Sequence, residues 1–231
     1  MSKNELKVLS AGAVKSGVSQ VAKEFERATG ARVTVEFNTA PELRKRIAAG
    51  DAADVVVAPP AAMDEFQKLG KIDAGTRGFV GRSRMGVVVH AQAQAPDIAD
   101  AAAFKRALQA ASAVVHNKAS SGIYSAKLLE KLGLKVALGA KIVVVDSGSA
   151  VMKTVAEKGP GAVGLAQISE VMVMIDKGCA VKLAAPLPDE IQNVTSYDAA
   201  ATPDAPDAAR ALARKLASDA ARKIFAATGI S

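Results

Sequence analysis

The sequence predicts an α/β protein with two lobes and largely parallel sheets. Short Val- and Ile-rich runs alternate with amphipathic stretches along the chain, which is the pattern of strands alternating with helices. The chain has 231 residues, long enough to bury one large core or two small ones. Half of the residues are hydrophobic but only 3% are aromatic, so we expect an aliphatic core.

The predicted strands are apolar runs with the length of buried strands. In chain order they are residues 6–10, 32–37, 54–58, 85–91, 113–116, 141–145, 162–166 and 180–183.

The predicted helices are bounded by residues with known positional preferences. Their expected starts and stops are Ser16 with Gly30, Pro41 with Gly50, Pro59 and Pro60 with Gly70, and Ser120 or Ser121 with Gly133. A further helix begins at Ser147 or Ser149, and the Ala-rich residues 204–227 form one or two more.

Two Pro-containing stretches, residues 92–97 and 186–193, interrupt this alternation. If the chain passes from one lobe to the other at these two stretches, one lobe is built from both chain ends and the other is inserted between them. We therefore expect residues 1–90 with 193–231 in the first lobe and residues 91–192 in the second.

Composition restricts the class of function. The net charge of +7 favours anionic partners, but the Lys and Arg residues are dispersed and stacking aromatics are scarce, so we expect small anions and no nucleic acid. No apolar run approaches the roughly 18 residues of a membrane span. The single Cys179 cannot form an internal disulfide. We expect a monomer without cofactor or metal.

The N-terminus, Met-Ser-Lys-Asn-Glu, lacks the apolar segment of a secretory signal. This leaves two alternatives: a cytoplasmic protein, or a periplasmic one whose signal has been removed.

The candidate ligand-binding residues lie mainly in strand-to-helix turns, because ligands of α/β sheets bind beyond the carboxyl ends of strands. Helix N-termini there offer free N–H groups and a partial positive charge to an anion. The candidates in these turns are Ala13, Lys15, Thr39, Ser120, Ser121 and Gly122. The alternative is that the polar residues only cap helices, and that Lys15 is a surface lysine.

Arg82 and Arg84 flank Ser83 and point to the same side of a strand, so they could clamp a carboxylate. The alternative is a solvated strand entrance. Tyr124 and Tyr197, the only tyrosines, are either phenolic donors to a ligand or half-buried structural residues.

Proton transfer requires a group that titrates near the working pH. Glu170, three residues after the candidate Gln167, is the carboxylate we consider for this role; the alternative is an exposed helix charge. His90 and His116 lie in or at the end of apolar strands and are expected to be structural.

Several motifs occur in an order and spacing that resemble type II periplasmic binding proteins, and among them the molybdate-binding protein family. They are Leu9-Ser10-Ala11-Gly12-Ala13, Leu43–Gly50 followed by Ala53-Asp54-Val55, Ser121-Gly122-Ile123-Tyr124, Gly164-Leu165-Ala166-Gln167-Ile168-Ser169-Glu170, and Pro186-Leu187-Pro188. The resemblance covers nearly the whole chain. It implies a two-lobed α/β fold with a ligand cleft between the lobes, and an ABC transporter permease as partner.

The chain departs from the molybdate proteins at their oxyanion donors. Ala13 stands where the family has a serine, and Thr39-Ala40-Pro41 replaces a run of serines; Tyr197 matches the family's tyrosine near the return crossing. Each missing buried hydrogen bond costs about 1–3 kcal/mol, so a true molybdate site is disfavoured.

The chain is also similar to a branch of substrate-binding proteins to which the trans-aconitate isomerases are related. The resemblance therefore implies either a solute-binding protein for a carboxylate or oxyanion, or a cofactor-free isomerase of an unsaturated polycarboxylic acid. In an isomerase Lys15, Tyr124 or Glu170 would move the proton. A ligand-responsive regulatory module is a third possibility.

Overall fold

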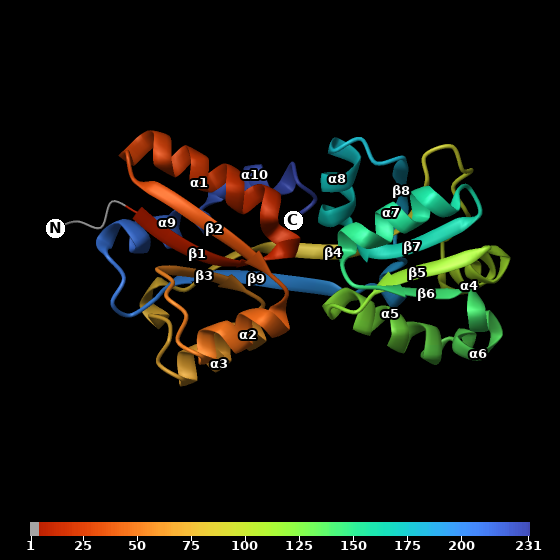
Figure 1. Cartoon of the computed structure of the whole chain (residues 1–231), viewed down its shortest axis with the longest axis horizontal. Helices are drawn as coiled ribbons and strands as arrows, with labels where there is room; N and C mark the ends of the chain where they lie inside the picture. The colour runs from red at the N-terminus through yellow and green to blue at the C-terminus, as the bar shows by residue number, and fades with distance from the viewer. Residues whose placement is uncertain (1–4) are drawn as a thin grey trace. The chain divides into compact units, whose positions relative to one another are not determined.

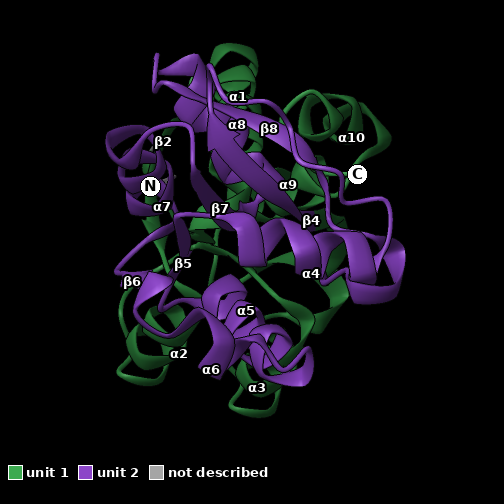
Figure 2. Cartoon of the chain, turned by 90° about the vertical axis from the view of Figure 1, so that its right-hand side faces the viewer, with its two compact units in different colours: residues 1–83, 195–231 green, residues 84–194 purple. Residues whose placement is uncertain are grey.

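The computed structural model describes residues 5–231 and divides into two compact units. Unit 1 contains the chain up to Ser83 together with Thr195–Ser231, and unit 2 is Arg84–Val194 (Figure 2). The sequence predicts divisions after residues 90 and 192. In the structure the first crossing lies inside a long strand, so the loop at residues 92–97 belongs wholly to unit 2.

Unit 1 is a sheet with helices on both faces. Its elements are β1 (Glu5–Ala11), the 3-10 turn η1 (Gly12–Val14), α1 (Lys15–Thr29), β2 (Arg32–Asn38), α2 (Ala40–Ala48), β3 (Val55–Ala58), α3 (Pro60–Lys68), η2 (Ala74–Thr76), the first part of β4 (Gly78–His90), β9 (Val194–Ala201), α9 (Asp207–Leu216) and α10 (Asp219–Ala226). Its strand order is β2-β1-β3-β9, with β1, β2 and β3 parallel and β9 antiparallel to β3.

Both faces of the unit 1 sheet are covered because its central strands are apolar along their whole length. Val55–Ala58 is completely buried. Helices α1 and α10 lie on one face and α2 and α3 on the other (Figure 1). Gly17 allows α1 to approach α10, since a Cβ there would fall 2.1 Å from the Phe225 ring.

Unit 2 repeats this layering. Its elements are the rest of β4, α4 (Ala101–Ala110), β5 (Ala113–Asn117), α5 (Ser120–Lys131), α6 (Leu134–Leu138), η3 (Gly139–Lys141), β6 (Ile142–Val145), α7 (Gly148–Lys158), β7 (Ala162–Gln167), α8 (Ile168–Asp176), β8 (Val181–Pro186) and η4 (Asp189–Ile191). The strand order is β8-β4-β7-β5-β6, with β5 parallel to β6 and β7 and with β4 antiparallel to β7 and β8.

Alternate residues of the unit 2 strands enter two separate cores. Val87 and Val89 pack with residues of α4, α5 and α6, whereas Val88 packs with residues of α7 and α8. Figure 1 shows α7 and α8 on one side of this sheet and α5 and α6 on the other. The predicted α/β class is therefore confirmed.

One predicted helix cap is wrong: Ser16 lies inside α1, because η1 runs directly into that helix without a side-chain cap. The predicted start of a helix at Ser120 or Ser121 is confirmed, since α5 begins at Ser120, with Ala119 in the N-cap position. Ser147 does cap α7, accepting a hydrogen bond from the Ala150 N–H at 3.2 Å.

Candidate functional site

Each unit gathers the first turns of its helices at one edge of its sheet. In unit 1 the parallel strands β1, β2 and β3 end at this edge and lead into η1 with α1, α2 and α3; we call it the unit 1 edge. In unit 2 the parallel strands β5, β6 and β7 end together and lead into α5, α7 and α8, which form the unit 2 edge. Because the first N–H groups of a helix have no acceptor within that helix, both edges present hydrogen-bond donors.

Ala13 and Thr39 both lie at the unit 1 edge. Ala13 is in η1, directly after β1, and Thr39 is the N-cap of α2. The Thr39 hydroxyl accepts a hydrogen bond from the Glu42 N–H at 3.4 Å, so it is a cap as well as a possible ligand donor. Lys15 is exposed, and its ammonium lies 5.1 Å from the centre of the Phe37 ring.

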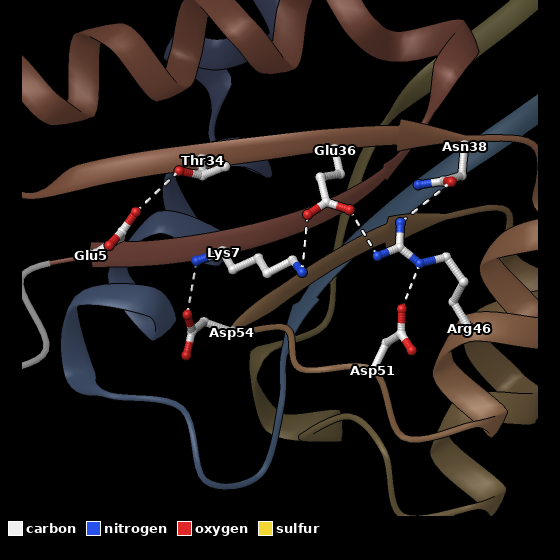
Figure 3. A network of polar contacts seen from close by, with 8 residues as sticks. All are labelled: Glu5, Lys7, Thr34, Glu36, Asn38, Arg46, Asp51 and Asp54. Carbon is white, nitrogen blue, oxygen red and sulfur yellow. Dashed lines mark hydrogen bonds and ion pairs between the residues drawn. The ribbon is translucent and has the colours of Figure 1, made fainter.

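Asn38, the last residue of β2, is a donor that the sequence analysis did not select. Its Oδ1 accepts a hydrogen bond from Arg46 Nη1 at 3.4 Å (Figure 3). Nδ2 is buried and has no partner among the described residues. A buried amide donor left unpaired costs about 1–3 kcal/mol, which an acceptor brought by a ligand would recover.

A network of charges fixes Arg46, and through it Asn38. Arg46 pairs with Glu36 at 2.7 Å and with Asp51 at 2.7 Å, and Lys7 pairs with the other oxygen of Glu36 at 2.9 Å (Figure 3). Hydrogen bonds from Lys7 and Arg46 lower the pKa of Glu36, so the network stays charged at neutral pH. The Asn38 amide is therefore held in one orientation.

At the unit 2 edge the side chain of Asn117, and not a serine hydroxyl, accepts hydrogen bonds from the start of α5. Its Oδ1 accepts hydrogen bonds from the N–H groups of Ala119 at 2.8 Å and Gly122 at 3.2 Å. Its Nδ2 donates to the buried Ser121 hydroxyl at 3.1 Å, whereas Ser120 is exposed. Ser121 thus supports the cap, and Ser120 is the serine whose side chain faces solvent.

Gly122 allows this tight turn. A Cβ at Gly122 would lie 1.6 Å from the main-chain oxygen of Asn117 and 2.7 Å from its Oδ1. Gly122 is therefore required by the backbone path of the turn.

Glu170 is the acidic residue of the unit 2 edge. It lies in the first turn of α8, and a Cβ at Gly148, the first residue of α7, would be 2.0 Å from its Oε2. The residue as a whole is partly exposed, but burial of its carboxyl group raises the pKa to about 7. Glu170 is thus less exposed than an ordinary helix-surface charge, and its part in proton transfer stays a prediction.

Gln167, Tyr124 and Tyr197 are held by contacts or by burial within the unit to which each belongs. Gln167 is buried and is the N-cap residue of α8. Tyr124 donates a hydrogen bond to the Ile191 carbonyl at 2.8 Å, and burial raises its pKa. Tyr197 is buried on β9 within the unit 1 core.

Arg82 and Arg84 fall in different units, and each guanidinium already has a neighbour. That of Arg82 lies 5.2 Å from the centre of the Phe79 ring, and that of Arg84 pairs with Asp189. Arg84 keeps a buried Nε without a partner among the described residues. The structure therefore describes two separately engaged arginines, where the sequence suggested a shared clamp.

Within residues 5–231, no group of three or more His, Cys, Asp or Glu side chains is arranged to hold a metal ion. No helix in that range has both the length and the apolar character needed to span a membrane.

The chain is similar to known proteins over nearly its whole length. A family model described as bacterial extracellular solute-binding protein matches residues 6–231. An aconitate isomerase from a Pseudomonas species is 28% identical over 233 residues, covering 97% of this chain and 87% of that relative.

Two solved structures illustrate the similarity of fold. The periplasmic molybdate-binding protein of Azotobacter vinelandii superposes with a TM-score of 0.77 at 18% identity, covering 98% of each chain. The sulfate-binding protein SubI of Mycobacterium tuberculosis H37Rv gives 0.73 at 18% identity, covering 98% of this chain and 86% of that one. At this level of identity the likeness establishes the fold.

Proposed function

Because the chain belongs to the bacterial extracellular solute-binding protein family, we propose that it binds a small anion, either a carboxylate or an oxyanion. The observation that carries the proposal is the unpaired Asn38 Nδ2, held by Arg46 at an edge where helix N-termini meet. A buried donor beside several main-chain N–H groups suits a deprotonated anionic ligand that offers several acceptor oxygens.

The unit 2 edge supports the same ligand class. Within unit 2 the first turns of α5 and α7 have main-chain N–H groups, and Ser120 has an exposed hydroxyl. The neighbouring Lys118 is paired with Asp146 at 2.9 Å, so the donors here are mainly neutral dipoles. Such donors hold an anion without requiring a matching cation.

In this function the chain delivers its anion to the permease of an ABC-type uptake system from the periplasm, or acts as an intracellular relative of such proteins. The family supports the first role. The molybdate- and sulfate-binding proteins that share the fold are consistent with an oxyanion ligand, but Ala13 and Ala40 lack the hydroxyls that a tetrahedral oxyanion would use. A carboxylate ligand fits these two alanines better.

A thermal-shift screen tests the proposal. The panel contains molybdate, tungstate, sulfate, phosphate, and di- and tricarboxylates that include cis- and trans-aconitate. A ligand that binds only the folded state raises the melting temperature by mass action, and we expect at least one anion to do so. A panel in which no anion changes the melting temperature would contradict the proposal.

A second candidate function is cofactor-free isomerisation of an unsaturated polycarboxylic acid. It is favoured by the Pseudomonas aconitate isomerase, which matches 97% of this chain, and by the placement of Glu170 beside the first turn of α7. Incubation of trans-aconitate with the protein, followed by NMR, tests it. Appearance of cis-aconitate would support isomerisation, and binding without conversion would leave the solute-binding role alone.

A further inference from the structure

The direction in which Asn38 Nδ2 donates is decided by the side-chain torsions of Asn38. The main chain of this residue is fixed, because Asn38 is the last residue of β2 and pairs with Ala11 of β1. Rotation about χ1 and a half-turn of the amide remain, and the half-turn exchanges a donor for an acceptor. An acceptor turned toward an anion repels it, so a donor site for an anion requires a restraint on this amide.

Arg46 provides such a restraint. Its Nη1 donates to Asn38 Oδ1 at 3.4 Å, and a guanidinium has donors but no acceptor. A half-turned amide would place its NH2 group against the N–H groups of Arg46, donor against donor. The amide oxygen therefore faces Arg46, and the nitrogen is the atom that has no partner among the described residues.

The Arg46 guanidinium is itself fixed, because all three of its nitrogens are engaged (Figure 3). Nε donates to Asp51 at 2.7 Å, and Nη2 pairs with one oxygen of Glu36 at 2.7 Å. Lys7 pairs with the other oxygen of Glu36 at 2.9 Å, which limits the movement of that carboxylate. A planar group contacted along each of its edges keeps one orientation, and Nη1 therefore presents its donor to Asn38 from a constant position.

Stability alone gives little reason for this arrangement. The side chains of Glu36 and Asp51 are each 39% exposed, and exposed ion pairs contribute little to stability. Arg44, two residues earlier on α2, makes an ion pair of the same length with Glu65 of α3. What Arg46 has in addition is the hydrogen bond to the Asn38 amide.

We infer that Arg46 is a positioning residue for the anion: it holds the Asn38 amide in the orientation from which Nδ2 donates to an oxygen of the ligand. The inference rests on the proposed function and deepens it, since Arg46 acts through Asn38 and not by contact with the ligand. The role requires an arginine. A lysine carries its donors on one atom and does not reach three acceptors placed around a guanidinium.

Loss of the restraint lowers affinity through the population of the binding-competent amide. An unrestrained Asn has two amide orientations and up to three staggered χ1 wells, so the competent fraction falls to between about one half and about one sixth. The apparent dissociation constant rises by the inverse of that fraction, which for Arg46→Lys is about twofold to sixfold. The lysine retains the positive charge, so long-range attraction of the anion is unchanged.

The experiment is a double-mutant cycle in which calorimetry measures the dissociation constants of molybdate and of trans-aconitate. The cycle contains wild type, Arg46→Lys, Asn38→Ala and the double variant. Asn38→Ala removes one neutral hydrogen bond to the ligand, roughly tenfold in affinity, so binding by the double variant stays measurable. Melting curves verify that each variant is folded.

Two further variants complete the design. Arg44→Lys is the matched control, because it makes the same substitution in an ion-paired arginine of the same helix. Asp51→Ala removes the acceptor of Arg46 Nε without changing Arg46 itself, and it takes the place of Arg46→Lys in the cycle if that variant does not fold.

We expect Arg46→Lys to weaken binding by at least about twofold when Asn38 is present and to have no further effect when residue 38 is Ala. Arg44→Lys should bind as the wild type does. An equal loss with and without Asn38 would show that Arg46 acts independently of the amide and would overturn the inference. Unchanged affinity in Arg46→Lys or in Asn38→Ala would overturn it as well.

These outcomes are distinct from a failure of the proposed function. In each of them the wild type still binds an anion, so the proposed function stands without the positioning role. Absence of wild-type binding to both probes and to every other anion of the thermal-shift panel would overturn the proposed function, and the inference with it.

Discussion

The carboxyl group of Glu170 and the main chain of Gly148 are in direct contact across the starts of α8 and α7. The space that a Cβ of residue 148 would need is occupied, with Oε2 at 2.0 Å and Oε1 at 2.6 Å from its position. Gly148 is thus the residue that allows a carboxyl group to be buried at this helix start.

Gly148→Ala tests this dependence. The added methyl group must displace the carboxyl end of the flexible Glu170 side chain, which costs less than displacing main chain. We expect a loss of about 1 kcal/mol in the free energy of unfolding, the low end of the range for a methyl group inserted into a packed site, measured with urea. Gly12→Ala is the control, because its Cβ would lie 3.8 Å from the Asn38 carbonyl in ordinary contact. Equal stability of Gly148→Ala and wild type would show that Glu170 moves aside without cost.

Glu170→Gln should change the pH dependence of stability. The pKa of Glu170 is about 7 in the folded protein against a reference value of 4.5, so between these values the unfolded chain releases a proton that the folded protein retains. The folded wild type is therefore destabilised as pH rises through this window, by up to about 3 kcal/mol. The amide does not titrate, so the stability of the variant relative to wild type should increase over the same window.

The measurement for this variant is urea denaturation at several pH values from about 4.5 to about 8. Glu42→Gln is the control, since residue 42 is exposed in the first turn of α2. A constant difference between Glu170→Gln and wild type across the range would mean that the carboxyl group is solvated in the folded protein.

The sequence predicted the fold well because the strands on which it depends are continuously apolar. Val55–Ala58 is one such run, and it forms β3 as expected. Strand β9 was not predicted: Val194–Ala201 contains Ser, Asp and a row of Ala, which have low strand propensity. It forms because Ala199, Ala200 and Ala201 pair with β3 in a buried sheet, a tertiary effect that local propensity does not contain.

The candidate site was harder to predict because its polar residues act through contacts distant in sequence. Ser120 and Ser121 were considered as caps on their composition alone, whereas Asn117 makes the cap by reaching forward to Gly122. Asn38 is oriented by its hydrogen bond from Arg46, and the position of Arg46 depends in turn on its ion pairs with Glu36 and the other charges of the network. Turn composition indicates which strand ends to inspect, and only the packing shows which donors are left unpaired.

Asn38→Asp tests whether the Nδ2 donor contacts the ligand. The substitution retains the shape and the oxygen that faces Arg46, but it replaces the unpaired donor with a negatively charged acceptor. We expect the affinity for molybdate or trans-aconitate to fall by at least about tenfold, roughly 1.4 kcal/mol, in calorimetric titrations. Thr34→Ala, an exposed change on the same strand, is the control. Unchanged affinity of Asn38→Asp would remove this amide from the binding site.

Gly122→Ala should be among the most damaging small substitutions in unit 2. Its Cβ would lie 1.6 Å from a main-chain atom, the Asn117 carbonyl oxygen, which cannot move without opening the turn between β5 and α5. The same shift would break the Asn117 cap, so we expect a loss of about 3 kcal/mol or more in the free energy of unfolding. Ser120→Ala, an exposed change in the same turn, should stay within about 0.5 kcal/mol of wild type. If urea denaturation gave the two variants equal stabilities, the close packing of Asn117 against Gly122 would not be required for this turn.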